Sequence, residues 1–301
     1  MNTAFPENLD SYLEMKRYRL VRSVLVYEKG QLAYERYFGK GGIHQRHPIK
    51  SVWKSILSLT LGICLDKGWI KDIDEPVSRF LPSFSRRSHP YHAALTIRHL
   101  VTMSSGIYWN SGTHYHAPML DQMRRSNDWA AHIADVRVAN CPGTRFTYNE
   151  WDVILLSALI GKVCGGSAWD VCRERLYNPL GIDSHPWTQS NCGIAYPSYG
   201  PDTTDALSAR DMAKIGLLML NNGLWDRQQV VSGGYIMRSV CPSPMNAGYG
   251  WLWWLSEKGY HARGFGGQEL NVYPDHNIVA VIQADITPSG KSYNDICENI
   301  I

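Results

Sequence analysis

The sequence predicts an α/β (α+β) fold in which an antiparallel sheet from the N- and C-terminal segments, flanked by helices, carries an inserted all-helical domain. Strand-like patterns occur near both ends of the chain, whereas the middle is mostly helical in pattern. We expect residues 1–75 and 205–301 to form the sheet domain and residues 76–204 to form the helical domain. A chain of 301 residues can bury a large core.

The N-terminal part predicts a hairpin followed by a buried helix. Residues 22–38 alternate between apolar and polar side chains, with Gly30 at the turn, which is typical of two antiparallel strands. Residues 51–67 are apolar nearly all round, as in a central helix with every face covered, and Gly68 is suited to end it.

Three helix patterns are clear in the rest of the first two thirds. One starts at Thr96 and runs toward Met103, and a second covers residues 151–163. The third covers residues 212–220 and has Ser208 as its expected N-cap, because a serine hydroxyl can accept a hydrogen bond from a backbone N–H of the first turn.

The last third returns to short segments rich in aromatic and β-branched residues, which predict a meander of strands before a short C-terminal helix. The expected strands are residues 249–254, 260–265, 269–273 and 278–284, and the expected helix is residues 293–301.

Composition excludes several classes of protein. With 44% hydrophobic and 19% charged residues the chain is globular rather than disordered. A net charge of +3 without a long basic run predicts no nucleic-acid or membrane partner, and no apolar run is long enough to span a membrane. Residues 1–18 lack a basic start followed by an apolar stretch, so we expect a cytoplasmic protein.

Cysteines and histidines predict no metal site and no cofactor. The seven cysteines are scattered without a CxxC pair, as expected for reduced thiols. Two close histidine pairs, His89/His92 and His114/His116, lack acidic partners at ligand spacing.

Ser51 and Lys54 are the first candidates for chemistry. At the start of the helix they would share one face, and the serine would have a free backbone N–H in the positive field of the helix N-terminus. Burial would lower the pKa of the lysine, so that a neutral amine could take the serine proton. The alternative is an N-cap serine followed by a solvated lysine, because S-x-x-K also arises by chance.

Tyr148 and a glycine-rich segment are the next candidates. A phenol can carry a proton when a neighbouring cation favours its ionised form, and Lys54 could be that cation; most tyrosines instead pack at helix starts. Residues 264–268 interrupt two strand patterns with three glycines, which indicates either close approach of a ligand or a tight turn. No G-x-S-x-G elbow occurs, which argues against an α/β-hydrolase.

In this order, the Ser51-Val52-Trp53-Lys54 segment, Tyr148-Asn149 and the Gly266-Gly267 strand resemble the serine β-lactamase and penicillin-binding-protein superfamily. The resemblance is closest to the class C β-lactamase-like branch, which includes esterases and 6-aminohexanoate-oligomer hydrolases. It extends over about residues 20–285, and connecting stretches at 67–77, 95–106, 179–182 and 209–216 are also similar.

The resemblance implies a covalent acyl-enzyme on Ser51. Lys54 and Tyr148 would share the proton, and the backbone N–H groups of Ser51 and Gln268 would form the oxyanion hole. Asn149, Glu150, Phe265, Gly266 and Gly267 would contact the substrate. Aromatic walls are expected from Trp53, Trp109, Tyr115, Trp187 and residues 251–254.

Two positions depart from the family pattern. Glu150 stands where the Tyr-x-Asn motif has asparagine. Its carboxylate could add a negative charge that raises the pKa of Lys54, or the side chain could point away from Lys54. Phe265 replaces the lysine or histidine that opens the third motif and helps hold the carboxylate of β-lactam substrates. We therefore expect hydrolysis of a small ester or amide. The alternatives are β-lactamase or DD-peptidase activity, and a catalytically silent binding or sensor module.

Overall fold

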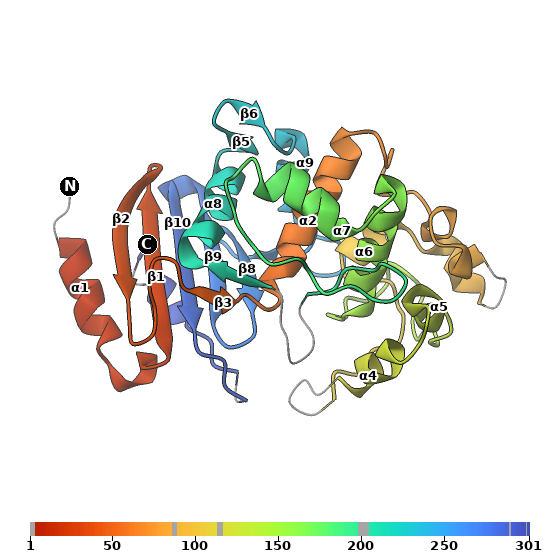
Figure 1. Cartoon of the computed structure of the whole chain (residues 1–301), viewed down its shortest axis with the longest axis horizontal. Coiled ribbons are helices and arrows are strands. Elements are labelled where there is room, and N and C mark those ends of the chain that lie inside the picture. Colours follow the sequence, from red (N-terminus) through yellow and green to blue (C-terminus); the bar gives the residue numbers. More distant parts are fainter. Residues whose placement is uncertain (1–3, 86–88, 113–116, 198–204, 289, 299) are drawn as a thin grey trace.

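The computed structural model describes residues 4–85, 89–112, 117–197, 205–288, 290–298 and 300–301. One six-stranded antiparallel sheet, in the order β2-β1-β10-β9-β8-β7, joins strands from both ends of the chain (Figure 1). This arrangement confirms the predicted fold class. The strands are β1 (Val21–Glu28), β2 (Gln31–Tyr37), β3 (Arg46–Pro48), β4 (Ala206–Ser208), β5 (Leu224–Trp225), β6 (Gln228–Gln229), β7 (Trp254–Leu255), β8 (Tyr260–Gly264), β9 (Gln268–Tyr273) and β10 (Ile278–Ala284).

Helices cover both faces of the sheet. The terminal helices α1 and α10 pack on one face, whereas α8 and α2 pack on the other, between the sheet and the remaining helices (Figure 1). The division of the chain after residues 75 and 204 stays a prediction. The helices are α1 (Ala4–Leu13), α2 (Val52–Asp66), α3 (Ile97–Val101), α4 (Pro118–Arg124), α5 (Trp129–Ala134), α6 (Trp151–Cys164), α7 (Ala168–Val171), α8 (Ala209–Leu220), α9 (Gly233–Ser239) and α10 (Asn294–Glu298).

The predicted hairpin forms β1 and β2, with Lys29 and Gly30 at the turn. Both turn residues have positive φ angles, 50° and 75°, as a two-residue hairpin turn requires. β1 pairs with β2 on one side and with β10 on the other, so the N- and C-terminal segments share one set of hydrogen bonds.

Helix α2 is buried on almost every side, as its apolar sequence predicts. Among its few polar side chains, the Ser55 hydroxyl donates to the Leu252 carbonyl at 2.6 Å, and the Thr60 hydroxyl donates to the Ile56 carbonyl at 2.9 Å. Helices α6 and α8 also lie where the sequence predicts them, and Ser208 accepts a hydrogen bond from the Asp211 N–H as an N-cap.

The predicted strand over residues 249–254 is wrong for most of its length. Only Trp254 and the following residue enter the sheet. Gly250 lies so close to the end of α9 that an added Cβ would be 2.3 Å from the Ser239 carbonyl oxygen, and Leu252 has a φ of 64°. Hydrogen bonds to Ser239 and Val101 therefore hold this segment in a bend that local sequence does not predict. The C-terminal helix is also shorter than expected.

Gly216 tests the packing of α8 on the sheet. An added Cβ there would lie 2.4 Å from a Val279 methyl group, inside the core. We expect Gly216→Ala to lower the free energy of unfolding by about 1–3 kcal/mol through overpacking. Gly234→Ala in α9 meets nothing within 4 Å and should be neutral or stabilising by up to about 1 kcal/mol. Urea denaturation measures both, and equal stabilities for the two variants would contradict this packing.

Asp152 is a fully buried carboxyl in α6. Burial raises its pKa to about 7. The folded protein therefore holds a proton that the unfolded chain has released, because an unfolded aspartate titrates near pH ~4. This contribution to stability is complete below pH ~4 and is lost as the pH rises to about 7.

Asp152→Asn should remove that pH dependence. The unfolding free energy of the variant minus that of the wild type should rise by about 2–3 kcal/mol from pH 5 to pH 8. The slope should be about 1.4 kcal/mol per pH unit in the range where Asp152 titrates. Urea denaturation at the two pH values measures this difference. A stability difference between the two proteins that is the same at both pH values would contradict it.

Candidate active site

Ser51 lies immediately before the first residue of α2. The preceding residue, Lys50, has a φ of 51°, in the left-handed region that residues other than glycine seldom adopt. Such backbone strain is found at functional sites, where the surrounding structure must maintain it. The strained turn brings Ser51 to the wall of a cavity, at the positive end of the helix.

Lys54 lies one turn along α2 and faces Ser51. Its ammonium Nζ donates a hydrogen bond to Ser51 Oγ at 3.0 Å, and its side chain is only 2% exposed. The predicted pair is therefore in direct contact. The alternative of a solvated first-turn lysine is wrong.

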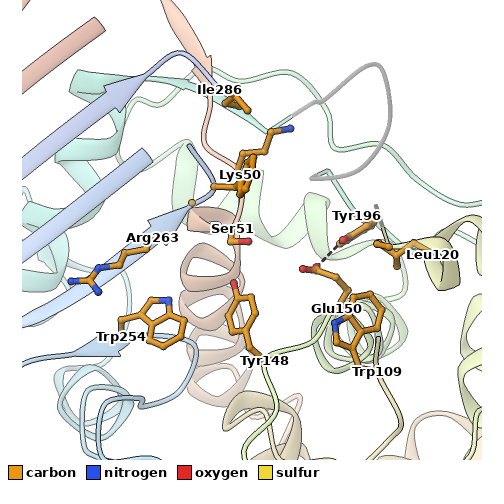
Figure 2. Close-up of a pocket in the computed structure, with 13 residues that line it drawn as sticks. Lys50, Ser51, Trp109, Leu120, Tyr148, Glu150, Tyr196, Trp254, Arg263 and Ile286 are labelled. Carbon is orange, nitrogen blue, oxygen red and sulfur yellow. Dashed lines mark hydrogen bonds between the residues drawn. The ribbon is translucent and has the colours of Figure 1, made fainter. Parts of the chain in front are cut away.

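Glu150 points toward Lys54 and forms a buried ion pair with it. The distance from Lys54 Nζ to Glu150 Oε1 is 2.7 Å, and the second oxygen, Oε2, accepts a hydrogen bond from the Tyr196 hydroxyl, also at 2.7 Å (Figure 2). Both carboxylate oxygens are thus engaged. Glu150 stands at the N-terminus of α6, next to Asn149, whose Oδ1 accepts a hydrogen bond from the Asp152 N–H.

This ion pair reverses the expected shift in the pKa of Lys54. Burial by itself lowers the pKa of Lys54. The electrostatic interactions of Lys54 with Glu150 and Tyr148, and its hydrogen bonds with these two residues, outweigh the effect of burial, so the pKa is raised. The expectation of a neutral amine is therefore wrong: a carboxylate directly beside an ammonium favours the charged form. Lys54 is an ammonium at neutral pH.

Tyr148 completes the predicted group. The centre of its ring lies 5.2 Å from Lys54 Nζ, and Figure 2 shows its hydroxyl directed toward Ser51. The ring stacks on Trp254, with 5.5 Å between the ring centres, and meets Tyr249 edge-on. This aromatic packing fixes the direction of the phenol.

These side chains share a cavity of about 590 Å³, called here the Ser51 cavity. Most of its wall is apolar or aromatic, as in many small-molecule sites. The wall consists of Lys50, Ser51, Trp109, Ala117, Leu120, Tyr148, Glu150, Tyr196, Trp254, Arg263, Gly264, Phe265 and Ile286.

Of the glycine-rich segment, only Gly264 and Phe265 line the cavity. Gly264 lies against the chain just before Ser51, since an added Cβ would be 2.1 Å from the Ile49 carbonyl oxygen, and Phe265 lines the cavity. Gly266 and Gly267 form the turn from β8 to β9, with φ angles of 85° and 86°. They are outside the cavity wall.

Gln268 and Asn149 do not reach the cavity wall either. Gln268 pairs with Gly264 in the sheet, and its side chain is buried there and donates to the Ala284 carbonyl at 2.7 Å. Asn149 has its amide group bonded to the Thr147 carbonyl and its oxygen capping α6. The structure therefore does not bring the predicted oxyanion donor Gln268 or the predicted contact Asn149 to the substrate space.

Of the expected aromatic walls, Trp109 and Trp254 line the cavity. Trp53, Trp187 and Trp253 are instead buried in the core, and Tyr115 is outside the described residues, as are His114 and His116. Within the described ranges, no group of three histidine, cysteine or acidic residues could hold a metal ion.

Three polar residues of the cavity were not singled out by the sequence. Tyr196 comes from an irregular segment with no motif around it, so no local signal connects it with Glu150. Lys50 has its ammonium at the cavity mouth, near Ile286 (Figure 2). Arg263 lies on β8, but its guanidinium points away from Ser51, and its buried Nε has no hydrogen-bond partner among the described residues.

No single helix in the described part of the chain has the length and apolar character needed to cross a membrane. The bent pair formed by α6 and the segment Ala168–Tyr177 passes that test only when its two helices are taken together.

Curated proteins match parts of this chain. An acyltransferase, calJ, of Penicillium decumbens is 28% identical over 174 residues, which are 50% of this chain and 39% of the relative. The chain spans between 36% and 39% of the length of the curated relatives that it matches.

Two solved structures share the fold over nearly the whole chain. The penicillin-binding protein from Bacillus halodurans superposes with a TM-score of 0.75 at 19% identity, covering 97% of this chain and 98% of its own. EstCE1, described as a hydrolase with promiscuous acyltransferase activity, superposes with a TM-score of 0.73 at 15% identity. The superposition covers 98% of this chain and 96% of the EstCE1 chain.

The model of the Beta-lactamase family matches residues 13–296, which is nearly the entire chain. The matched range includes Ser51, Lys54, Tyr148 and the end of β8. The protein belongs to the β-lactamase family.

Proposed function

We propose that this protein is a serine hydrolase that cleaves a small ester or amide through an acyl-enzyme on Ser51. The observation that carries the proposal is the 3.0 Å hydrogen bond from the Lys54 ammonium to Ser51 Oγ, in a cavity that Tyr148 also lines. A nucleophile, a cation and a group able to carry a proton are then within reach of one substrate carbonyl.

In the first step, Ser51 Oγ bonds to the substrate carbonyl carbon while its proton passes to the ionised oxygen of Tyr148. Lys54, already charged, stabilises the negative oxygen of either residue but does not take the proton. When the tetrahedral intermediate collapses, the bond to the leaving group breaks and Tyr148 returns the proton to that group. A water molecule then attacks the acyl-enzyme by the same sequence and releases the acid.

The oxyanion hole in this proposal consists of the backbone N–H groups of Ser51 and Phe265. Ser51 is at a helix N-terminus, where backbone N–H groups lack intrahelical acceptors. Phe265 replaces Gln268 as the second donor, because Phe265 lines the cavity and follows Gly264, which touches the chain before Ser51. One such donor typically contributes about 3–4 kcal/mol to lowering the barrier.

The cavity favours an apolar acyl group. Trp109, Leu120, Trp254 and Phe265 offer aromatic and aliphatic surface, and burial of apolar area contributes about 25 cal/mol per Å². EstCE1, which has the same fold, is described as a hydrolase, in agreement with an esterase-type reaction. We therefore place simple esters with an apolar acyl chain first among substrates.

β-Lactam hydrolysis is the second candidate, because the matching family model carries that description. Against it stand the apolar Phe265 and the outward direction of the Arg263 guanidinium (Figure 2), which leave little to hold a substrate carboxylate beside β8. Nitrocefin hydrolysis that exceeds the background rate and is lost in Ser51→Ala would favour this candidate.

Ser51→Ala tests the nucleophile. We expect turnover of p-nitrophenyl butyrate to fall by about 1000-fold or more, because no other group forms the acyl-enzyme. A fluorophosphonate probe should label the Ser51 peptide in the wild type, as mass spectrometry detects. Ser55→Ala is the matched control: Ser55 is buried in the same helix, bonds to the Leu252 carbonyl and should keep labelling. Equal rates for wild type and Ser51→Ala would exclude a hydrolase and leave the silent binding module.

Trp254→Ala tests the apolar acyl site. Loss of this wall should lower kcat/KM for p-nitrophenyl butyrate about 10-fold, and for the acetate less, because the longer chain loses more apolar contact. Trp69, a partly exposed tryptophan outside the cavity, offers a control in Trp69→Ala, which should change neither value. If Trp254→Ala reduced both esters equally, the loss would come from the Tyr148 phenol that stacks on Trp254, and Trp254 would not be the acyl wall.

A further inference from the structure

The Ser51 cavity contains a buried group that the Ser51, Lys54 and Tyr148 scheme does not use. Glu150 bridges Lys54 and Tyr196 with one oxygen to each, at 2.7 Å in both cases. Glu150 is 8% exposed as a residue and Lys54 1%. Three side chains from α2, the start of α6 and the segment before β4 thus form one continuous chain of hydrogen bonds leading to Ser51 Oγ.

We propose that Glu150 and Tyr196 form a positioning pair that holds Lys54 as an ammonium aimed at Ser51 and thereby sets the pH range in which the site works. Neither residue touches the reacting atoms; both act through Lys54. The inference rests on the proposed hydrolase function.

The hydrogen-bonding capacity of each group supports this role. An ammonium has three donors and no acceptor. Lys54 directs one donor to Ser51 Oγ and another to Glu150 Oε1, and it also has a hydrogen bond with Tyr148. Tyr196 then occupies the other carboxylate oxygen, so Glu150 cannot rotate away without losing that bond. Glu150, held by Tyr196, therefore fixes the direction of the Lys54 ammonium group, which donates its other hydrogen bond to Ser51.

The pair also changes the charge next to the nucleophile. With an amide at position 150 the buried group would have a net charge of +1, whereas Glu150 brings the Lys54–Glu150 pair to zero. A negative charge beside groups that must lose a proton raises the pH at which they lose it. Glu150 therefore moves the onset of activity to higher pH while it preserves the cation beside Ser51.

Apart from Tyr148, whose oxygen is ionised in the proposed reaction, the groups around Lys54 do not supply a second negative charge in place of Glu150. Tyr249 meets Tyr148 edge-on in the aromatic wall, and burial raises the pKa of Tyr249 well above its ordinary value. Asp152 lies further along α6, and burial raises its pKa to about 7. Lys50 and Arg263, the remaining charged residues of the cavity wall, are cationic.

A purely structural role explains the pair less well. A buried ion pair stabilises a fold little more than well-packed apolar side chains would, because both charges must leave water. Glu150 is, in addition, part of the wall of the same cavity as Ser51 and Tyr148, rather than of the core.

The test compares Glu150→Gln, Glu150→Asp and Tyr196→Phe by their pH profiles of kcat and kcat/KM with p-nitrophenyl butyrate. In Glu150→Gln the acidic limb of kcat/KM should shift to lower pH by about 1–3 units, because the negative charge is gone. Glu150→Asp keeps the charge, so its limb should stay in place while kcat falls. Tyr196→Phe should lower kcat about 10-fold, with KM within about threefold and the limb in place.

Tyr235→Phe is the matched control. Its hydroxyl donates to the Ser58 carbonyl at 2.7 Å and is equally buried, but it lies away from Lys54, so its loss should lower stability and leave the profile unchanged. A folded Glu150→Gln with an unshifted acidic limb would overturn the proposal. Should Glu150→Gln fail to fold by circular dichroism, an unchanged kcat in Tyr196→Phe would overturn it instead.

A titration of the Lys54 side chain by nuclear magnetic resonance separates this proposal from the hydrolase proposal. The Lys54 signal, identified by its loss in Lys54→Gln, should remain that of an ammonium to higher pH in the wild type than in Glu150→Gln, whereas Tyr196→Phe, which keeps the carboxylate, should titrate like the wild type. Absence of Ser51-dependent turnover would refute the hydrolase alone. Identical titrations in all three proteins would refute the positioning pair.

Discussion

The buried ion pair between Lys54 and Glu150 is the interaction on which the site depends. Two charges removed from water must each be compensated, and losing one partner of such a pair typically costs about 3–5 kcal/mol. The pair therefore fixes the start of α6 against α2 as strictly as apolar packing does. Because Tyr148 lies two residues before Glu150, the same contact brings the phenol to Ser51.

The scaffold around this pair is rigid for identifiable reasons. Helix α2 is enclosed on nearly all sides, with its polar side chains bonded inside the helix or to the adjoining chain. On the other side of Ser51, Gly264 allows β8 to approach the Ile49 carbonyl so closely that no side chain would fit between them. The strained φ of Lys50 is held between these two constraints.

A mostly apolar cavity makes its few charges effective. Electrostatic interactions are stronger away from bulk water, so the Lys54 ammonium can stabilise a negative oxygen on Ser51 more than an exposed lysine could. The balancing carboxylate of Glu150 limits that effect, and Tyr196 determines where the carboxylate points. In the mechanism proposed here, the chemistry of the site depends on Glu150 and Tyr196, which do not contact the reacting atoms.

The sequence by itself determined the fold class, the main helices and most strands, because these follow from local apolar periodicity and capping, as at Ser208 and along α2. It also singled out Ser51, Lys54 and Tyr148 as candidates from local motifs, and the structure places these three side chains together. Tertiary structure alone decided the charge of Lys54, the engagement of Tyr196, the displacement of Gln268 from the cavity and the bend after Tyr249. Each of these depends on groups far apart in the chain that only folding brings within hydrogen-bonding or Coulombic range.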